Sequence, residues 1–340
     1  MSIPKPKITD VAKYAGVSVS TVSLALSGKG RISEATISKV NQAIETLGYV
    51  RNTAAANLRS HTSNLIGLVL KDITDPFYMG ITAGLSDQLE KQGYMLFLAQ
   101  SGNDKSKQLH CIQSMIQQGV AGIVFCPVRE GTQSCLDLIE QANIPAISIA
   151  RADINAKIDY VGPDNTHAAT LATQHLIAQG HRHIAYLGGT SGSLTRAERI
   201  GGYCSTLMQY GLPFKNEWVV ECDKRQQSAA DAAQKLLNKH PKITAILCHR
   251  SATTIGAIYG AQAAGKTIGK DNYIGQQVAL LGFDDAAEAE LTTPSLSFVN
   301  TSTKQIGQQA ALQMVRKMKQ PHLPPQRIII SPTIILRDSA

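Results

Sequence analysis

The stretch ITDVAKYAGVSVSTVSLALSGKG, residues 8–30, places apolar residues at helical spacing on both sides of one glycine, Gly16. Glycine permits the tight turn that two short helices need at this point. Thr9 and Ser18 are the expected N-caps, because short hydroxyl side chains satisfy free amides at helix starts. A third helix is predicted over 34–47, where apolar residues recur every three to four positions.

The second predicted helix has two different faces. At 100° per residue, Val22, Ala25 and Leu26 fall on one side. The other side and its flanks carry short, uncharged side chains, namely Ser20, Thr21, Ser23 and Leu24. Three short helices of this kind predict a helix-turn-helix. The outer face of its second helix needs short side chains, because that helix enters the major groove of DNA. A plain three-helix bundle is the alternative, although hydroxyls that can donate to phosphates and base edges favour DNA.

The charge of the chain is unevenly distributed. The 340 residues carry a net charge of +8, and residues 1–60 contain eight Lys and Arg against three acidic residues. A small basic domain on a nearly neutral body indicates a polyanionic partner. The start MSIPKPKITD has no apolar signal segment and no apolar run reaches membrane-spanning length, so we expect a cytoplasmic protein without membrane contact.

The rest of the chain alternates short apolar runs with helix-like spans. Runs such as LIGLVL (65–70) and GIVFC (122–126) are separated by spans such as 77–92. This alternation predicts βαβ units and parallel sheets. Two doubly wound lobes fit the number of runs better than a single TIM barrel, and IDYVGPDN (158–165) has the character of a crossover between lobes. A ligand is then expected in the cleft at the carboxyl ends of the strands.

Catalytic and metal-binding signals are missing from the sequence. There is no GxSxG, HExxH or Walker loop, and no GxGxxG after a strand. The six cysteines form no CxxC or CxxH pair. We therefore predict no catalytic residue, no cofactor and no metal, and the chain is not expected to be an enzyme.

Taken together, several segments resemble the lac/gal repressor (LacI/GalR) family of bacterial transcription regulators. They are the stretch from residue 8 to residue 59 and, in the core, DPFY, VGPDN, GHRHIAYLGG, RAERIGGY, VALLGFDD and LTTPSLSFV. The resemblance covers the whole chain. It implies an all-α helix-turn-helix headpiece, a periplasmic-binding-protein-like core of two doubly wound lobes, and repression of carbohydrate genes from a palindromic operator, with a small ligand modulating DNA affinity. A repressor whose core serves only dimerisation is the alternative.

The expected domains follow from this organisation. They are a headpiece at 1–50, a hinge helix or linker at 51–62, a core N-terminal lobe at 63–164 and 303–325, and a core C-terminal lobe at 165–302 and 326–340. The end IIISPTIILRDSA lacks the leucine heptad helix of tetrameric relatives, so we expect a homodimer.

The resemblance assigns base reading to Val19, Ser20 and Leu24, with Thr21 and Ser23 beside them. Many relatives carry Arg or His at the position of Leu24. A leucine cannot make a bidentate contact to guanine but can contact a thymine methyl group. We therefore expect an A·T pair, or a tolerant position, opposite Leu24.

The segment RNTAAANLRS, residues 51–60, resembles the hinge of the family. In relatives the hinge folds when two copies meet in the minor groove, where a leucine wedges between base steps. Leu58 holds that position, and Asn52 and Ala55 hold the matching sites around it. Arg51 replaces a proline common in the family, and an inert linker is the alternative interpretation.

The resemblance also implies a sugar or nucleobase ligand between the lobes. The positions that match the family's ligand contacts are Asp75, Phe77, Tyr78, Arg199, Lys224, Arg250 and Asp284. Arg199 and Asp284 would hydrogen-bond the ligand, or else form an interlobe ion pair. Lys224 stands where relatives often have an aromatic residue, and Arg250 lies where an Asn-Asp pair is common. A neutral sugar, an anionic sugar phosphate and no effector at all remain open.

Overall fold

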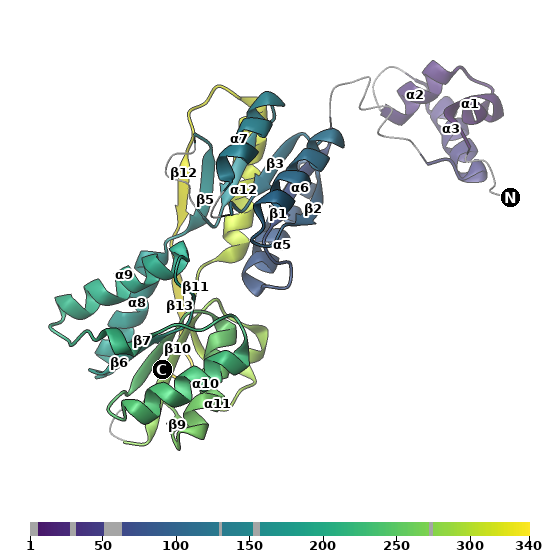
Figure 1. Ribbon diagram of the computed structural model, residues 1–340. Helices are drawn as coiled ribbons and strands as arrows, with labels where there is room; N and C mark the ends of the chain where they lie inside the picture. Colours follow the sequence, from purple (N-terminus) through teal and green to yellow (C-terminus); the bar gives the residue numbers. More distant parts are fainter. Residues whose placement is uncertain (1–5, 28–31, 51–62, 129–130, 152–156, 272–274) are drawn as a thin grey trace. The chain divides into compact units, whose positions relative to one another are not determined.

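The computed structural model describes residues 6–27, 32–50, 63–128, 131–151, 157–271 and 275–340 (Figure 1). The chain divides into two compact units, Met1–Ser63 and Asn64–Ala340. Among the helices of the described ranges, none combines the length and the apolar character that crossing a bilayer requires.

The first unit is a bundle of three short helices. They are α1 (Ile8–Ala15), α2 (Val19–Ser27) and α3 (Glu34–Leu47). Their shared core consists of Val11, Ala12, Val22, Val40 and Ala43. The prediction of the third helix over 34–47 is confirmed: Ser33 caps its start and Gly48, at φ 62°, ends it.

The start of α1 differs from the prediction. Thr9 is not the N-cap but lies inside the first turn, which begins at Ile8. The residue at the cap is Lys7, whose amide donates to Asp10 Oδ2 at 2.8 Å. Asp10, at the third helical position, therefore takes part in capping the helix by accepting from the amide of the N-cap residue. Gly16 ends the helix at φ 65°, as the turn requires.

The second unit is an α/β core of two lobes, and the first lobe has a parallel sheet covered on both faces. In spatial order its strands are β12 (Arg327–Ile330), β5 (Asp159–Pro163), β4 (Ala146–Ile149), β3 (Gly122–Phe125), β1 (Leu65–Leu70) and β2 (Met95–Gln100). Helices α5 (Pro76–Glu90) and α12 (Thr303–Lys319) pack on one face, and α6 (Lys105–Gln117) and α7 (Thr132–Gln141) pack on the other.

Two glycines bring α5 and α12 into close contact. A Cβ at Gly84 would lie 2.0 Å from the Lys304 carbonyl oxygen, and one at Gly307 would lie 2.1 Å from the Ile81 carbonyl oxygen. Any side chain at either position would push the helices apart. This contact fastens α12 to the first lobe although it follows the whole second lobe in sequence.

The second lobe has a similar architecture, except that one of its edge strands is antiparallel. Its strands, in spatial order, are β13 (Thr333–Ile335), β11 (Ser297–Asn300), β10 (Gln277–Phe283), β8 (Ala245–Cys248), β6 (Ile184–Leu187) and β7 (Val219–Val220), with β9 (Thr267–Ile268) paired to β10. The edge strand β13 pairs antiparallel with β11. Helices α8 (Asn165–Ala178) and α9 (Leu194–Gln209) cover one face, and α10 (Gln226–Lys239) and α11 (Ser251–Ala263) cover the other. Short 3-10 turns lie at Asn216–Trp218 and Ala287–Glu290.

The chain passes between the lobes after β5, after β11 and after β12. The crossover predicted near residue 163 is therefore confirmed. The predicted return to the second lobe at residue 326 is wrong, because β12 pairs in parallel with β5 of the first sheet. The apolar end of the chain is divided between the two sheets, because Pro332, which cannot donate to a ladder, separates β12 from β13.

Candidate DNA-reading face and interlobe site

Helix α2 begins at a hydroxyl cluster. Ser18 Oγ accepts a hydrogen bond from the Thr21 amide at 3.1 Å, which confirms the predicted cap. The same oxygen lies 2.7 Å from Ser20 Oγ and 2.8 Å from Thr21 Oγ1. The cap thus fixes both the start of the helix and the hydroxyls around it.

The two predicted faces of α2 are present. Val22 is fully buried, and Ala25 and Leu26 pack against the headpiece core. The side chains of Val19 and Leu24 are 39% and 44% exposed. Ser20 and Ser23 are also exposed, and Thr21 is half-buried. The outer face is therefore small and uncharged, while its role in reading bases stays a prediction. Asn52, Ala55 and Leu58 lie outside the described residues.

Two carboxylates are held in place where β1 ends. Asp72 Oδ1 accepts from the Thr74 amide at 3.0 Å and from the Thr74 hydroxyl at 2.6 Å. Asp75 is the N-cap of α5, and its Oδ1 accepts from the Phe77 amide at 3.1 Å. Pro76 at the first helical position has a fixed φ that suits a helix start. The sequence KDITDPFY therefore presents both carboxylates at the carboxyl end of the first sheet.

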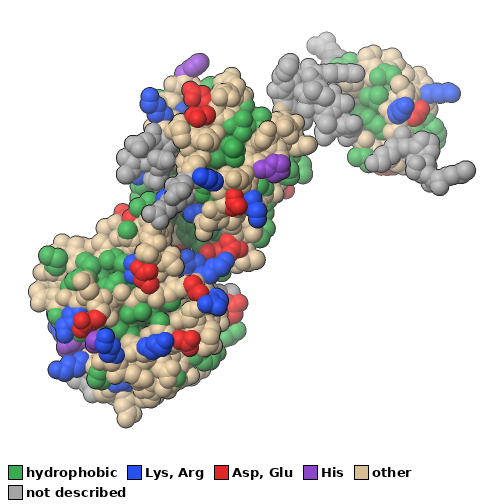
Figure 2. Space-filling model, viewed as in Figure 1, with side chains coloured by type: hydrophobic (Ala, Val, Ile, Leu, Met, Phe, Trp, Pro, Cys, Tyr) green, Lys and Arg blue, Asp and Glu red, His purple; other side chains and the backbone are tan. Residues whose placement is uncertain are grey.

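Cations of the second lobe contact these carboxylates. Lys224, shortly after β7, contacts Asp72 through Nζ, and Arg250 Nη1, after β8, lies 3.1 Å from Asp75 Oδ2. The hydrogen bond from Lys224, followed by that from Thr74, lowers the pKa of Asp72 to about 2. Figure 2 shows basic and acidic side chains gathered where the two lobes meet. Asp72 was missed in the sequence, although an acidic residue directly after a buried strand was the available signal.

Arg199 is buried inside the second lobe, with 2% of its surface exposed. Its Nε donates to Asn165 Oδ1 at 3.0 Å, and its Nη1 donates to the carbonyl oxygen of His249. Its Nη2 lies 3.4 Å from Asp284 Oδ2, and the guanidinium lies 4.0 Å from the centre of the Phe283 ring. The alternative of an interlobe ion pair for Arg199 and Asp284 is therefore wrong, because both residues belong to the same lobe.

The two predicted stacking residues lie at the start of α5. The rings of Phe77 and Tyr78 are 5.2 Å apart and nearly perpendicular. The Tyr78 hydroxyl lies 3.3 Å from Cys126 Sγ, just beyond β3. Burial raises the pKa of Tyr78 well above its usual range, so the hydroxyl stays protonated. Of the predicted effector residues, the structure thus pairs Asp75 with Arg250 and Arg199 with Asp284, while Lys224 pairs with the unpredicted Asp72.

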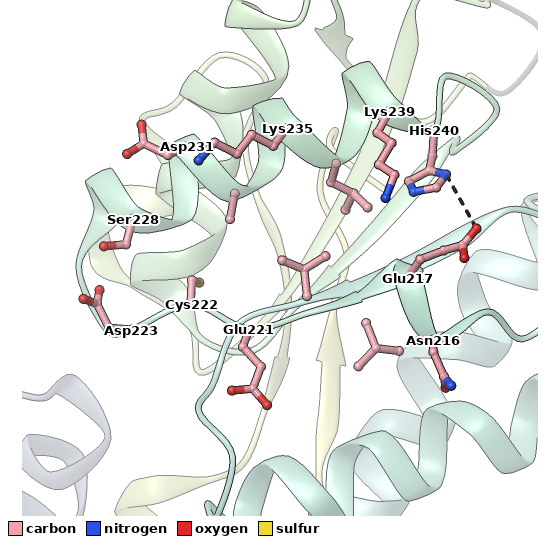
Figure 3. Close-up of a pocket in the computed structure, with 14 residues that line it drawn as sticks. Asn216, Glu217, Glu221, Cys222, Asp223, Ser228, Asp231, Lys235, Lys239 and His240 are labelled. Carbon is pink, nitrogen blue, oxygen red and sulfur yellow. Dashed lines mark ion pairs between the residues drawn. The ribbon is translucent and has the colours of Figure 1, made fainter.

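A separate groove of about 710 Å³ runs along the edge of the second sheet (Figure 3). Val219, Val220 and Leu236 are among its apolar lining residues. At one end His240 Nδ1 lies 3.9 Å from Glu217 Oε1. None of the predicted effector residues lines this groove.

The chain was compared with known proteins. Residues 7–52 match the family described as "Bacterial regulatory proteins, lacI family", and residues 63–337 match "Periplasmic binding proteins and sugar binding domain of LacI family". Over 97% of its length the chain is 43% identical to the Maltose regulon regulatory protein MalI of Escherichia coli (strain K12), of which it covers 98%.

Two solved structures share the architecture. One is the lac repressor dimer bound to operator and the anti-inducer ONPF, with a TM-score of 0.86, 22% identity and 99% of each chain covered. At this identity the likeness concerns the fold alone. The other is the transcriptional regulator CelR-cellobiose complex, with a TM-score of 0.73, 26% identity, and 98% of this chain and 100% of that one covered.

Proposed function

Because the chain belongs to the LacI family of bacterial regulatory proteins, we propose that it is a repressor of maltose-related genes that binds a palindromic operator as a dimer. The assignment to maltose rests on the 43% identity to MalI. The observation that supports sequence-specific recognition of DNA is the exposed, uncharged outer face of α2 in a helix-turn-helix bundle. We place the protein in the cytoplasm, on nucleoid DNA.

The short side chains of this face suit close approach to base edges. Ser20 and Ser23 can donate to phosphates or bases, and Val19 and Leu24 can contact thymine methyl groups. The surplus of Lys and Arg in residues 1–60 supplies attraction to the phosphate backbone. Asn52, Ala55 and Leu58 are proposed to act in the minor groove.

An apolar surface on the first lobe supports the dimer. Met95 and Phe97 lie on the edge strand β2 and are 63% and 39% exposed, and Met79 on α5 is 56% exposed. Large apolar side chains that remain exposed on an edge strand and a nearby helix are typical of interaction surfaces. A second copy of the chain is the proposed occupant, because two half-sites one helical turn apart require two headpieces.

The charges at the interlobe face favour a neutral effector. Lys224 and Arg250 are already paired with Asp72 and Asp75, so an anion would gain little from these cations and would meet the carboxylates beside them. The hydroxyls of a neutral sugar can accept from the cations and donate to the carboxylates. We propose a neutral sugar, contacted also by Phe77 and Tyr78; a core that only dimerises is the alternative. Calorimetry should detect heat with maltose-type sugars and none with their phosphates, and the opposite result would refute a neutral effector.

Selection from a random pool of DNA duplexes tests the repressor assignment directly. The full-length protein should enrich one palindromic sequence in moderate salt. Ser23→Asp should weaken binding to that sequence by at least about tenfold, since a carboxylate on α2 would face phosphates. Asn238→Asp makes the same charge change on exposed α10 and should leave affinity unaltered. Failure of the wild type to enrich any sequence would overturn the assignment, and equal losses in both variants would overturn the role of α2.

A further inference from the structure

We propose that Lys224 and Arg250 form an ionic latch that holds the two lobes of the core together when no ligand is bound. The latch consists of the pairs Lys224–Asp72 and Arg250–Asp75, each of which joins one lobe to the other. The proposal goes beyond the repressor function, because it concerns the ligand-free core alone. In the absence of ligand, these two cations connect the lobes in the way that a bound ligand would.

The carboxylate side of the latch is held by local hydrogen bonds. Asp72 is fixed by the amide and hydroxyl of Thr74. The amide of the intervening Ile73 donates to Gln100 Oε1 at 2.9 Å, which ties the loop to the end of β2. Because these bonds exist within the first lobe, little conformational entropy is lost when the cations arrive.

The backbone next to Arg250 is also held by hydrogen bonds within its own lobe. Arg250 is the N-cap residue of α11 and follows His249, whose amide donates to the Leu187 carbonyl oxygen at 2.8 Å. The carbonyl oxygen of His249 accepts from the buried Arg199. The backbone before Arg250 is thus anchored on both sides, which makes Arg199 a positioning residue for the latch.

Two carboxylates close to Lys224 in sequence are paired within the second lobe. Asp223 is bound by Arg225 at 2.7 Å, and Glu221 is bound by Arg196 at 3.3 Å. These partners leave Asp72 as the carboxylate that Lys224 contacts. Lys224 is 68% exposed, whereas Arg250 is 35% exposed, so salt screens the lysine pair more strongly and the arginine pair contributes more.

The latch lies where a ligand would bridge the lobes. Both carboxylates follow β1, and both cations follow strands of the second sheet, so the pairs join the carboxyl ends of the two sheets. Partly exposed ion pairs of this kind each stabilise a contact only modestly, by less than about tenfold in an equilibrium constant. Loss of both pairs should therefore raise the ratio of open to closed core by roughly tenfold.

Single-molecule energy transfer within the ligand-free, full-length protein tests the latch. One dye is placed at Gln92 of the first lobe and one at Asn238 of the second, both exposed, through noncanonical residues that spare the native cysteines. The double variant Lys224→Gln, Arg250→Gln should populate a longer interlobe distance. Lys242→Gln removes an exposed cation before the amino end of β8, at the opposite end of that strand from Arg250, and it should leave the distance unchanged.

Exchanging the two charges distinguishes loss of the ion pair from a nonspecific effect of the substitutions. Lys224→Asp should open the core, because two carboxylates would then face each other, and Asp72→Lys in the same chain should close it again. Circular dichroism confirms that each variant is folded. Equal distance distributions for the wild type and the double Gln variant would overturn the latch. A core that opens as expected in a protein that selects no operator would support the latch and refute the repressor, so the two proposals fail separately.

Discussion

The outer face of α2 and the interlobe face of the core have contrasting chemistry. On α2 the exposed side chains are short and uncharged. At the interlobe face they are long and charged, and each charge lies beside an opposite one. The short side chains of α2 allow another molecule to approach closely. The ion pairs of the interlobe face hold the protein's own lobes and side chains in position. Changes at α2 should therefore alter recognition, whereas changes in the charged network should alter stability or conformation.

The largest effect is expected at the buried Arg199. Arg199→Met should lower the free energy of unfolding of the core by about 3–5 kcal/mol, since Asp284, whose side chain is 13% exposed, would keep a largely buried charge without its partner. Asn165 and the His249 carbonyl would lose donors as well. Urea unfolding, followed by the fluorescence of Trp218, the single tryptophan of the chain, measures this loss.

The matched control for this variant is Arg225→Met. Arg225 is 75% exposed and pairs with Asp223 on the surface, so its loss should cost less than about 1 kcal/mol. Equal losses in the free energy of unfolding for the two variants would contradict the importance of burial. The contacts of Arg199 would then stabilise the protein no more than an ordinary surface ion pair does.

Acid should destabilise the core and spare the headpiece. Burial lowers the pKa of His181 to about 4, and His181 Nδ1 lies 2.9 Å from Thr244 Oγ1. Because the pKa of His181 is lower in the folded state than in the unfolded state, its contribution to the free energy of unfolding is fully present above the unfolded pKa of about 6.5. Below that pH the unfolded chain binds a proton more readily than the folded protein does, so the contribution is lost as the pH falls. Between pH 7 and pH 5 the core should lose about 2 kcal/mol through this group.

The comparison with the headpiece makes this prediction sharper. Residues 1–60 contain no histidine, so the helicity of the isolated 1–60 peptide should hardly change between the two pH values. In the full chain, His181→Asn should make the dependence of the Trp218-detected urea midpoint on pH less steep, and burial, which also lowers the pKa values of His249 and His175, should preserve the remainder. A dependence as steep as that of the wild type would show that another group is responsible.

The sequence predicted what depends on local pattern. The apolar stripe predicted helix α3 over its whole length, and the structure adds a cap at Ser33 and a terminal glycine at Gly48, both next to the helix in sequence. The latch could not be predicted in this way, since Arg250 and Asp75 are 175 positions apart. Arg199 is predicted to contact ligand from the resemblance to the family, and the fold adds that its donors contact Asn165, His249 and Asp284 of its own lobe.

The smallest effect is expected at Leu24, where recognition alone should change. Leu24→Arg should shift the preferred base pair opposite this residue from A·T toward G·C by about 1 kcal/mol, because arginine can contact guanine through two hydrogen bonds. Leu24 is 44% exposed, so the stability of the headpiece should be nearly unaltered. Leu24→Met preserves apolar contact and should preserve the preference for A·T. Selection and sequencing of bound duplexes measure both variants. An unaltered profile for Leu24→Arg would refute the contact, whereas unfolding of the headpiece would place Leu24 in its core and end the contrast between a reading surface and a structural one.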